Sequence, residues 1–468
     1  MDSRSVLVLE LNELCPPLLE RFIAAGDLPN FARLRDESVV YVTDAGEVQE
    51  HLNPWIQWVT AHTGVPYEAH RIFKLGEGAL LKTPTVADLV VQAGGTVWLC
   101  GPMNVVPTAP VRGRWLPDPW NPDDHAVPPE LAPFARFVRG NVQEHTNPAH
   151  RLTVPAQLRF GAFMLRHGLS FASLRAAAGQ LVGERLGRRE RWRRAALLDR
   201  FQWDLFRHEL RALQPAFATY FSNTTAHYQH LYWRYMDPTP FDLKPSADDV
   251  RRFGEAVRFG YVEMDRIVGD ALALVGDSSA LVLCTALSQQ PYLSTDQVGG
   301  SRFYRPNDIG GLVARLGVHG VLKVSPVMSE QFHLYFASEA DAEAAAAILG
   351  SASVGKVPAF SVRRVGADVF AGFAIKHDLP SEAEILVAAT GARVAVAAEM
   401  YRSETPKSGY HHPAGAFWVR TPGGTGANGG SVSLQAVAPT LLTLLGLEPA
   451  ESMRCPPADL DPSEVAGS

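Results

Sequence analysis

Cysteine is scarce in this chain of 468 residues, which contains only four. The four lie far apart, and no Cys-x-x-Cys pair occurs among them. This spacing argues against a disulfide framework and against a zinc site built from thiolates. Cys15, Cys100 and Cys284 fall in apolar, strand-like runs, where a buried free thiol is the expected state.

An excess of positive charge is lacking as well. The formal net charge is -6 and the isoelectric point is near 6.2, so no global positive field exists to hold a nucleic acid. No uninterrupted apolar run is long enough to cross a membrane. The N-terminal stretch "MDSRSVLVLELNEL" lacks the basic start and long apolar core of a signal peptide. We therefore expect a cytoplasmic protein with no transmembrane segment and no nucleic-acid partner.

Alternating strand and helix patterns are present at both ends of the chain. The apolar run at 5–11 is typical of a buried strand, and helical patterns and further strands follow it. This alternation favours an α/β fold with a mostly parallel sheet between helices. The run 433–449 predicts a last amphipathic helix, preceded by a glycine-rich loop at 421–430.

Two internal segments have a different pattern. A long helical region with weak breaks at Gly168 and Gly187 predicts a helical insertion or cap, and a strand–helix–strand–strand order further on predicts a small α+β insertion. The expected organisation is a core of residues 1–130, 211–304 and 396–455, a helical insertion at 131–210, an α+β insertion at 305–395 and a flexible tail at 456–468.

Four separated stretches carry a family resemblance. They are "VLVLELNELCPPLLERFIAAGDLPNFARL", "NPWIQWVTAHTGVPYEAHRI", "TTAHYQHLYWRYMDP", and "SGYHHPAGAFWV" with "VAPTLLTLLGLEP". In this order they resemble the alkaline phosphatase superfamily, in particular its type I phosphodiesterase and nucleotide pyrophosphatase-like branch. The resemblance implies that family's α/β fold. It also implies a chemistry in which one divalent ion activates a Thr, Ser or Cys nucleophile and a second stabilises the leaving oxygen.

Most positions that the resemblance assigns to metal binding carry other residues here. The residues at the ligand and nucleophile positions are Asn12, Pro54, Ala226, Ala286 and Leu287. Alanine and leucine cannot coordinate a metal, so we expect no two-metal centre and favour no metal at all.

The family's histidine ligands are retained as His230 and His411. At most one divalent ion, such as zinc, could be held by these two residues with a carboxylate from Glu10 or Glu13. A regular strand would point Glu10 and Asn12 one way and Glu13 the other.

Histidines are the main candidates for chemistry. His227 and His230 lie three residues apart and would share a helix face, and His411 would approach from a strand. Neutral imidazoles suit acid–base catalysis or anion binding, so these three are the candidate catalytic residues. Alternatively, they are inherited polar groups satisfied by hydrogen bonds. The candidate substrate-binding residues are Asn12, Glu13, His51, Asn53, Asn223, Ser288, Gln289 and His412.

Three of these candidates, Asn53, Ser288 and Gln289, also have structural interpretations. Asn53 before Pro54 is typical of a helix N-cap, although the same helix start could bind an anion. Ser288 and Gln289 are either part of a turn around Pro291 or polar groups that contact a ligand.

Two functions remain open. One is a hydrolase or group transferase acting on a phosphate-, sulfate- or acyl-bearing small molecule. The other is an inactive ligand-binding or accessory protein in glycan, lipid or secondary-metabolite assembly. The partner expected in either case is a small anionic or polar molecule.

An arginine-rich segment has two interpretations of its own. Residues 184–194 hold six arginines against two glutamates. They form either a solvated helix face or a peripheral contact with an anionic surface, because apolar residues lie upstream at Phe160, Phe163, Met164 and Phe171.

Overall fold

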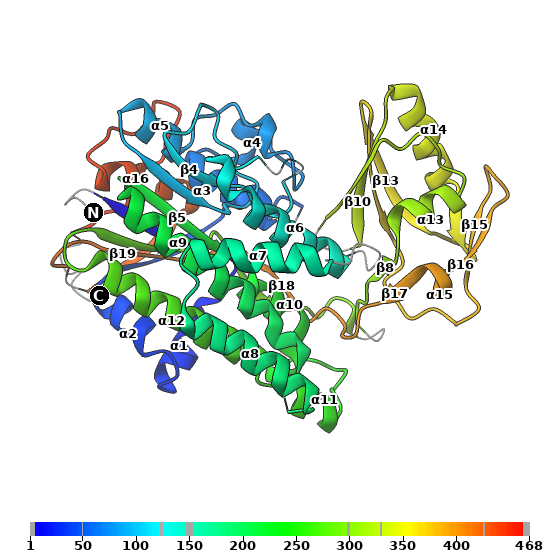
Figure 1. Cartoon of the computed structure of the whole chain (residues 1–468), viewed down its shortest axis with the longest axis horizontal. Helices are drawn as coiled ribbons and strands as arrows, with labels where there is room; N and C mark the ends of the chain where they lie inside the picture. The colour runs from blue at the N-terminus through cyan, green and yellow to red at the C-terminus, as the bar shows by residue number, and fades with distance from the viewer. Residues whose placement is uncertain are drawn as a thin grey trace.

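The body of the protein is built around one large sheet. The computed structural model describes residues 5–461, apart from 49, 122, 124, 147–152, 189, 297–299, 328–329 and 425. Eight strands stand in the order β20-β2-β19-β6-β1-β5-β3-β4 (Figure 1). Their bounds are β1 Val6–Leu11, β2 Val39–Asp44, β3 Val97–Cys100, β4 Gly113–Leu116, β5 Phe217–Ser222, β6 Ala280–Cys284, β19 Ala414–Arg420 and β20 Ala427–Ser433. Only β19 runs antiparallel to its neighbours, so the predicted α/β class with a mostly parallel sheet is confirmed.

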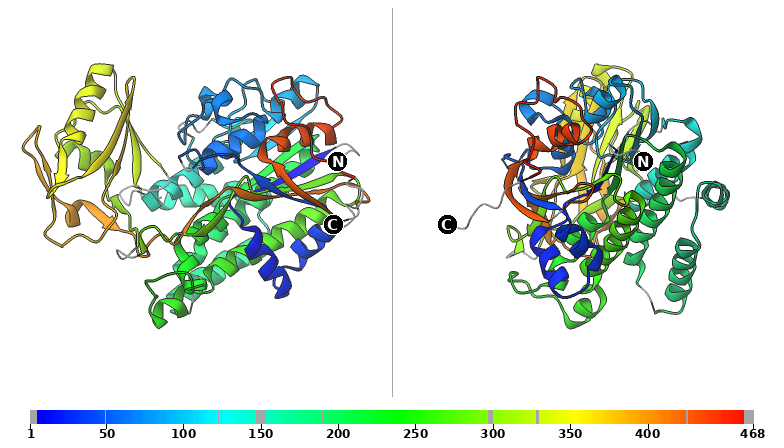
Figure 2. Two further views of the ribbon diagram at one scale, coloured as in Figure 1. Left: turned by 180° about the vertical axis from the view of Figure 1, so that it is seen from behind. Right: turned by 90° about the vertical axis from the view of Figure 1, so that its left-hand side faces the viewer.

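Helices cover both faces of this sheet (Figure 2). Leu7, Leu9 and Leu11 of β1 enter one apolar cluster, whereas Val6 and Val8 enter another. Because both faces are buried, β1 is apolar at nearly every position instead of alternating with polar residues. The first face is covered by α1 Pro16–Ala24, α2 Pro29–Asp36, α9 Ala195–Leu213, α10 Thr224–Met236 and α12 Ala256–Val275. The second is covered by α3 Pro54–Thr63, α5 Val86–Gln92 and α16 Val437–Leu444.

In the part of the chain that the structure describes, the helical region contains four α-helices, and the last of them packs on the sheet. It consists of α6 Ala132–Thr146, α7 Val154–Arg166, α8 Phe171–Arg185 and α9. Gly168 and Gly187 follow α7 and α8 with φ angles of 88° and 63°, which only glycine adopts without strain. Helix α9 packs on the sheet, where Trp203 meets Tyr220 edge to face. It therefore belongs to the layer that covers the sheet.

A separate apolar cluster lies in residues 304–402, which we call the α+β lobe. Its helices are α13 Ile309–Arg315, α14 Glu339–Gly350 and α15 Val396–Glu399. Its two four-stranded sheets comprise β9 Lys323–Pro326, β10 Gln331–Tyr335, β13 Phe360–Val365 and β14 Asp368–Phe373, and β11 Ala352–Val354, β12 Val357–Pro358, β15 Glu384–Val387 and β16 Arg393–Ala395. The antiparallel pair β8 Tyr304–Pro306 and β17 Met400–Arg402 joins the lobe to the body.

Several small elements complete the fold. They are α4 Tyr67–His70, α11 Ala247–Phe253 and the antiparallel pair β7 Ser288–Pro291 and β18 Gly409–His412.

The structure corrects two predictions near the end of the chain. The prediction of a glycine-rich loop at 421–430 is wrong for residues 427–430, because β20 begins at Ala427 and pairs with β2. Of the expected tail, residues 456–461 include Ala458, which packs in the second apolar cluster, and 462–468 lie outside the described residues. The domain limits themselves stay a prediction.

Membrane-spanning helices were expected to be absent. Among the described residues, none of the helices combines the length and the apolar character that crossing a bilayer requires.

Candidate functional site

A buried carboxylate lies at the end of the first strand. Strand β1 ends at Leu11, and Glu13 follows with a φ of 55°, in the left-handed region. The strand alternation that separates Glu10 from Glu13 in the sequence therefore does not extend to this residue. The Glu13 side chain is completely buried. It is held in the core of the body between α10, β7 and β18.

Two histidines and a glutamine contact this carboxylate. Glu13 Oε1 forms a hydrogen bond with His411 Nδ1, and Oε2 lies 3.2 Å from His230 Nε2. Gln289 Nε2 donates a further hydrogen bond to Oε2 at 2.9 Å. The rings of His230 and His411 are perpendicular, with centroids 5.4 Å apart. We call Glu13, His230, His411 and Gln289 the Glu13 cluster.

The local fold explains how the cluster assembles. His411 on β18 stands opposite Gln289 on β7 in the antiparallel pair. Gly409 allows β18 to approach α10, because a Cβ at this position would lie 2.6 Å from the Gln229 carbonyl oxygen. Gln229 in turn donates to the backbone carbonyl of Glu13 at 2.7 Å and accepts from Tyr261. The left-handed turn at Glu13 is thereby fixed from α10 and α12.

Hydrogen bonding sets the protonation of both rings. A carbonyl oxygen can only accept, so His230 Nδ1 donates to Gly409 O over 2.8 Å. His411 Nδ1 donates to the Glu13 carboxylate, which leaves His411 Nε2 with the lone pair when the ring is neutral.

Burial and the neighbouring charges shift the pKa values of Glu13 and His230 in the cluster. Burial alone would raise the pKa of Glu13, but His411 and His230 hold it well below its usual range. Burial lowers the pKa of His230 despite the opposing effect of Glu13. A neutral His230 would point its Nε2 lone pair at a carboxylate oxygen, so a proton or a cation between these two atoms is needed.

Lys407 is a neighbour of the cluster that the sequence did not indicate. Its ammonium lies over the rings of Tyr410 and Tyr292, 4.7 and 5.7 Å from their centroids. Burial lowers the pKa of Lys407, and Glu13 partly opposes this. Because Lys407 precedes β18 by two residues, only the close approach of β18 to α10 brings it near Glu13.

His227 lies on α10 beside His230, as the helical spacing predicts. Burial first, then Arg305 and His230, lower its pKa to about 4. The ring is therefore neutral at physiological pH. The histidines that contact Glu13 are His230 and His411, so a catalytic role of His227 stays a prediction.

Asn12 and Asn223 belong to a second polar group. Asn12 Nδ2 donates to Asn223 Oδ1 at 2.7 Å, and Trp58 Nε1 donates to Asn12 Oδ1 at 2.8 Å. The Asn12 side chain is completely buried. Its hydrogen bonds therefore go to α3 and to the start of α10, and not to the histidines with which the sequence grouped it.

Glu10 is paired on the opposite face of the sheet. Its Oε1 lies 2.8 Å from His62 Nε2, and both side chains are buried. Of the two carboxylates that the sequence offered as partners of His230 and His411, the structure brings Glu13 to them.

The other expected substrate-binding residues are dispersed. The rings of His51 and Tyr67 are in contact, with centroids 4.2 Å apart and planes inclined by 40°. Asn53 occupies the N-cap position of α3, but its side chain makes no capping bond and donates to Glu50 O instead.

The interpretation of Ser288 and Gln289 as part of a turn around Pro291 is wrong, because both residues lie in strand β7. Ser288 is buried opposite His412. His412 Nδ1 accepts a hydrogen bond from Ala414 N.

Asp199 is a buried titratable group that sequence reasoning missed. Ser222 Oγ donates to its Oδ1 at 2.9 Å, next to the Asn12 group. Burial raises the pKa of Asp199 to about 7, against hydrogen bonds from Thr224 and Ser222. Its place in a segment rich in arginine gave no sign that α9 would bury it against the sheet.

We expect Asp199→Asn to stabilise the protein at alkaline pH. A carboxyl group whose pKa is raised on folding favours the folded state at low pH, and this contribution is lost as the pH rises towards 7. The variant should melt roughly 2–4 °C above the wild type at pH 8.5, and the difference should be clearly smaller at pH 5. Thermal melts at both pH values test this, with the exposed Asp248→Asn as a control. Equal shifts at both pH values would contradict it.

Three groups of described residues have the composition and proximity to hold a divalent ion. They are Glu13 with His230 and His411, Glu209 with His167 and His208, and His51 with Glu47 and Glu68. Within each group the candidate ligand atoms lie within 4.8 Å of one another. The first group is the only one of these three whose members the sequence offered as metal ligands.

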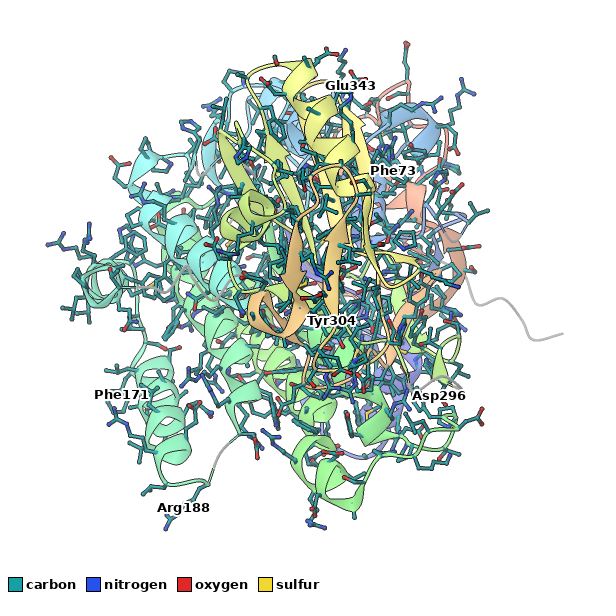
Figure 3. The ribbon with its side chains drawn as sticks, turned by 90° about the vertical axis from the view of Figure 1, so that its right-hand side faces the viewer. Phe73, Phe171, Arg188, Asp296, Tyr304 and Glu343 are labelled. Carbon is teal, nitrogen blue, oxygen red and sulfur yellow. The ribbon has the colours of Figure 1, made fainter. Side chains whose placement is uncertain are left out.

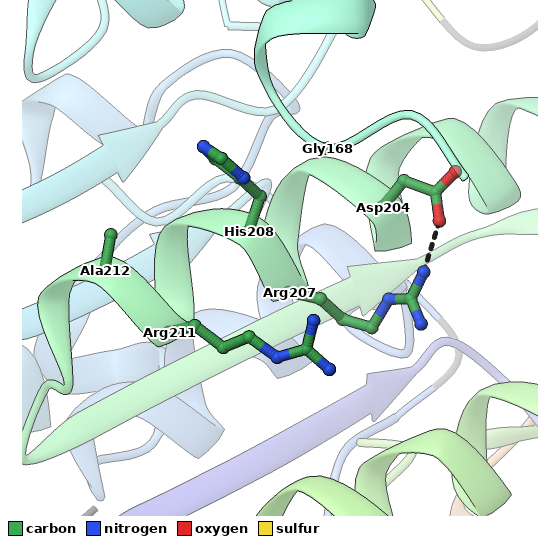
Figure 4. Close-up of a pocket in the computed structure, with 6 residues that line it drawn as sticks. All are labelled: Gly168, Asp204, Arg207, His208, Arg211 and Ala212. Atoms are coloured by element: carbon green, nitrogen blue, oxygen red, sulfur yellow. Dashed lines mark hydrogen bonds and ion pairs between the residues drawn. The ribbon is translucent and has the colours of Figure 1, made fainter.

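A pocket of about 350 Å³ opens elsewhere, on the helical region (Figure 4). It is lined by Gly168, Asp204, Arg207, His208, Arg211 and Ala212. Arg207 forms an ion pair with Asp204 over 2.6 Å. None of these residues belongs to the Glu13 cluster.

The comparisons with known proteins give a similarity in structure but none in sequence. No protein-family model and no curated protein matches this chain. In structure it is similar to murine ectonucleotide pyrophosphatase/phosphodiesterase 5, solved as an inactive variant in complex with AMP. The TM-score is 0.41 and the identity 10%, over 95% of this chain and 96% of the other.

Proposed function

We propose that this chain is a divergent member of the alkaline phosphatase superfamily and acts as a hydrolase or group transferase. The substrate class is a phosphate-, sulfate- or acyl-bearing small molecule, and the reaction centre is the Glu13 cluster. The observation that carries this proposal is the fully buried Glu13 carboxylate, which is bonded to two histidines. Burying a carboxylate is costly, and this one orients two groups that can transfer protons.

His411 is suited to act as the general base. Glu13 accepts from Nδ1 and so fixes the tautomer in which Nε2 carries the lone pair. The same carboxylate stabilises the imidazolium that forms when Nε2 takes a proton from water or from an acceptor hydroxyl. The proton can then pass to the leaving group, and His411 returns to its neutral state.

His230 and Lys407 are suited to stabilise negative charge. Protonated at Nε2, His230 would carry a positive charge beside Glu13, and Lys407 adds another. Developing charge on a phosphoryl, sulfuryl or acyl oxygen gains most from donors that are already in place in a partly buried site. Polar binding groups are supplied by Gln289 and by the exposed Gln290 on β7.

The two-metal centre of the family does not fit the residues present. The Asn12 side chain is engaged by Trp58 and Asn223, Pro54 opens α3, and Ala226, Ala286 and Leu287 are buried without a ligand atom.

A single ion fits the cluster better. Glu13, His230 and His411 could hold one divalent ion such as zinc, which would polarise a substrate oxygen or supply a bound hydroxide. The bond from His230 Nδ1 to a backbone carbonyl is the kind that orients a metal-bound histidine.

Metal content provides the first test. We expect the purified chain to contain no more than one tightly bound divalent ion, and aryl phosphodiesters to turn over poorly. Elemental analysis and assays before and after chelation measure both. Two zinc ions per chain with robust phosphodiesterase activity that chelation abolishes would contradict the proposal.

A ligand-binding role is the second candidate, and the closed hydrogen bonding of Glu13 favours it. An assay of the wild type and His411→Ala with a panel of aryl phosphate, sulfate and acyl esters distinguishes the enzymatic role from the ligand-binding role. The proposal expects turnover of at least one ester that His411→Ala abolishes. His333→Ala is the matched control, because His333 is also buried and bonded to a carboxylate, Asp368, but lies in the α+β lobe. Binding without turnover of any ester would support the accessory role and overturn the enzymatic one.

A further inference from the structure

Helix α8 places its apolar residues towards solvent. The residues that it buries are Ser173, Gln180 and Gly183. Phe171 at its start is 79% exposed, and Leu174 and Leu181 are about half exposed, at 50% and 52%. A helix that contributes only to the stability of a globular protein has the opposite arrangement. This arrangement indicates that the outer face of α8 contacts a partner.

Both α7 and α8 expose apolar side chains. Positions 171, 174, 178, 181 and 182 recur at helical spacing, and α7 adds two more residues seven positions apart. Among the described residues, seven of the eighteen large exposed hydrophobic side chains lie within 158–186. We call these seven the α7–α8 face: Leu158, Leu165, Phe171, Leu174, Leu181, Val182 and Leu186. Exposed apolar residues clustered in this way mark an interaction site.

The apolar residues that face solvent are not those that the sequence suggested. Phe160, Phe163 and Met164 are buried in the main apolar cluster. Of the four residues named in the sequence, only Phe171 points outward. Figure 3 shows Phe171 and Arg188 at the two ends of the α8 segment, on the outer edge of the molecule.

The charge around this face is positive. Residues 154–188 contain five arginines and one acidic residue, Glu184, which pairs with Arg194. All five are exposed: Arg159, Arg166, Arg175, Arg185 and Arg188. The whole chain carries a net charge of -6, so this local excess is opposite to the charge of the molecule.

We propose that the α7–α8 face binds the surface of an anionic phospholipid membrane. Apolar side chains would enter the boundary between headgroups and acyl chains, and the arginines would pair with lipid phosphates. Two copies of this chain joined symmetrically through this face would set their arginines against each other, which disfavours a dimer. The inference concerns a surface that the proposed reaction does not use.

Vesicle sedimentation with the full chain tests the proposal. We expect binding to vesicles of phosphatidylcholine with phosphatidylserine, little binding to phosphatidylcholine alone, and weaker binding as NaCl is added. The variant Phe171→Ser with Leu174→Ser should reduce the partition coefficient at least about tenfold. Arg175→Glu with Arg185→Glu should reduce it by about twenty-five-fold or more, because each arginine near an anionic surface contributes roughly a fivefold gain.

Matched controls keep the result specific. Leu322→Ser removes a side chain that is 70% exposed in the α+β lobe, and Lys356→Glu reverses an exposed charge there. Both should bind vesicles as the wild type does, and all variants should keep its melting temperature within a few degrees. No binding to the anionic vesicles, or equal binding by the α7–α8 variants, would overturn the proposal. So would an oligomer, seen by sedimentation velocity, that the Phe171→Ser/Leu174→Ser variant loses.

Discussion

Replacing Glu13 by glutamine is expected to lower kcat/KM for the best ester substrate by about a thousandfold or more. The amide cannot stabilise a protonated His411, and it can turn an NH2 group towards the Nδ1–H that now meets a carboxylate oxygen. The change is isosteric, so binding of substrate should suffer less than turnover. Steady-state kinetics that separate kcat from KM measure this.

The sequence offers a close control for that experiment. Glu10 lies on β1, three residues before Glu13, is also buried and also contacts a histidine, His62, but on the other face of the sheet. Glu10→Gln should leave kcat within about twofold, since it touches no member of the Glu13 cluster. If both variants lose activity equally, the effect is one of folding, and the assignment of the reaction to Glu13 fails.

Acid pH should weaken the same cluster. The pKa of Glu13 is held below its usual range by its histidines, so its stabilising contribution is present at neutral pH and is lost as the pH falls below that range. Burial lowers the pKa of His230 despite the opposing effect of Glu13, so protonating this ring costs free energy in the folded state, and stability is lost as the pH falls through 6.5. Both groups act in the same direction.

The architecture follows from patterns that a sequence displays directly. The apolar run of β1 lacks alternation because both faces of the sheet are covered. The alternation of strand and helix patterns along the chain indicated the mostly parallel α/β sheet. Gly168 and Gly187 end α7 and α8 because both take positive φ angles. These features depend on local periodicity and backbone freedom, which a single sequence records.

The composition of the site could be predicted only in part. His230 and His411 were expected to meet, but the position of Glu13 depends on a left-handed turn that strand periodicity does not reveal. Lys407 and Asp199 become relevant through burial, which arises from contacts between distant segments. The polar pattern of Ser288 and Gln289 resembles a turn, yet pairing with β18 makes it a strand. Tertiary pairing overrode local propensity at these positions.

The ion pair between Arg234 and Asp296 should have the largest effect on stability. Arg234 lies one turn beyond His230 on α10, is 2% exposed, and contacts Asp296 Oδ1 at 2.6 Å. Its Nη1 also donates to Leu243 O at 2.7 Å, and its guanidinium lies over the ring of Phe241. Arg234→Met preserves much of the volume but leaves Asp296 buried without a cation. We expect a loss of about 3–5 kcal/mol in the free energy of unfolding, measured by urea denaturation.

A double-mutant cycle and a pH series separate charge from packing in this loss. Adding Asp296→Asn to Arg234→Met should recover part of the stability, because the unpaired charge disappears. Burial would raise the pKa of Asp296, but hydrogen bonds from Leu243 and Arg234 hold it below its usual value. The benefit of the pair is therefore lost as the pH falls through that lowered pKa, and the penalty of Arg234→Met should shrink in acid. The exposed pair of Arg251 with Asp248 is the reference, where Arg251→Met should cost less than about 1 kcal/mol. A comparable loss for both arginines would show that the buried pair has no special role in anchoring α10, and with it His230.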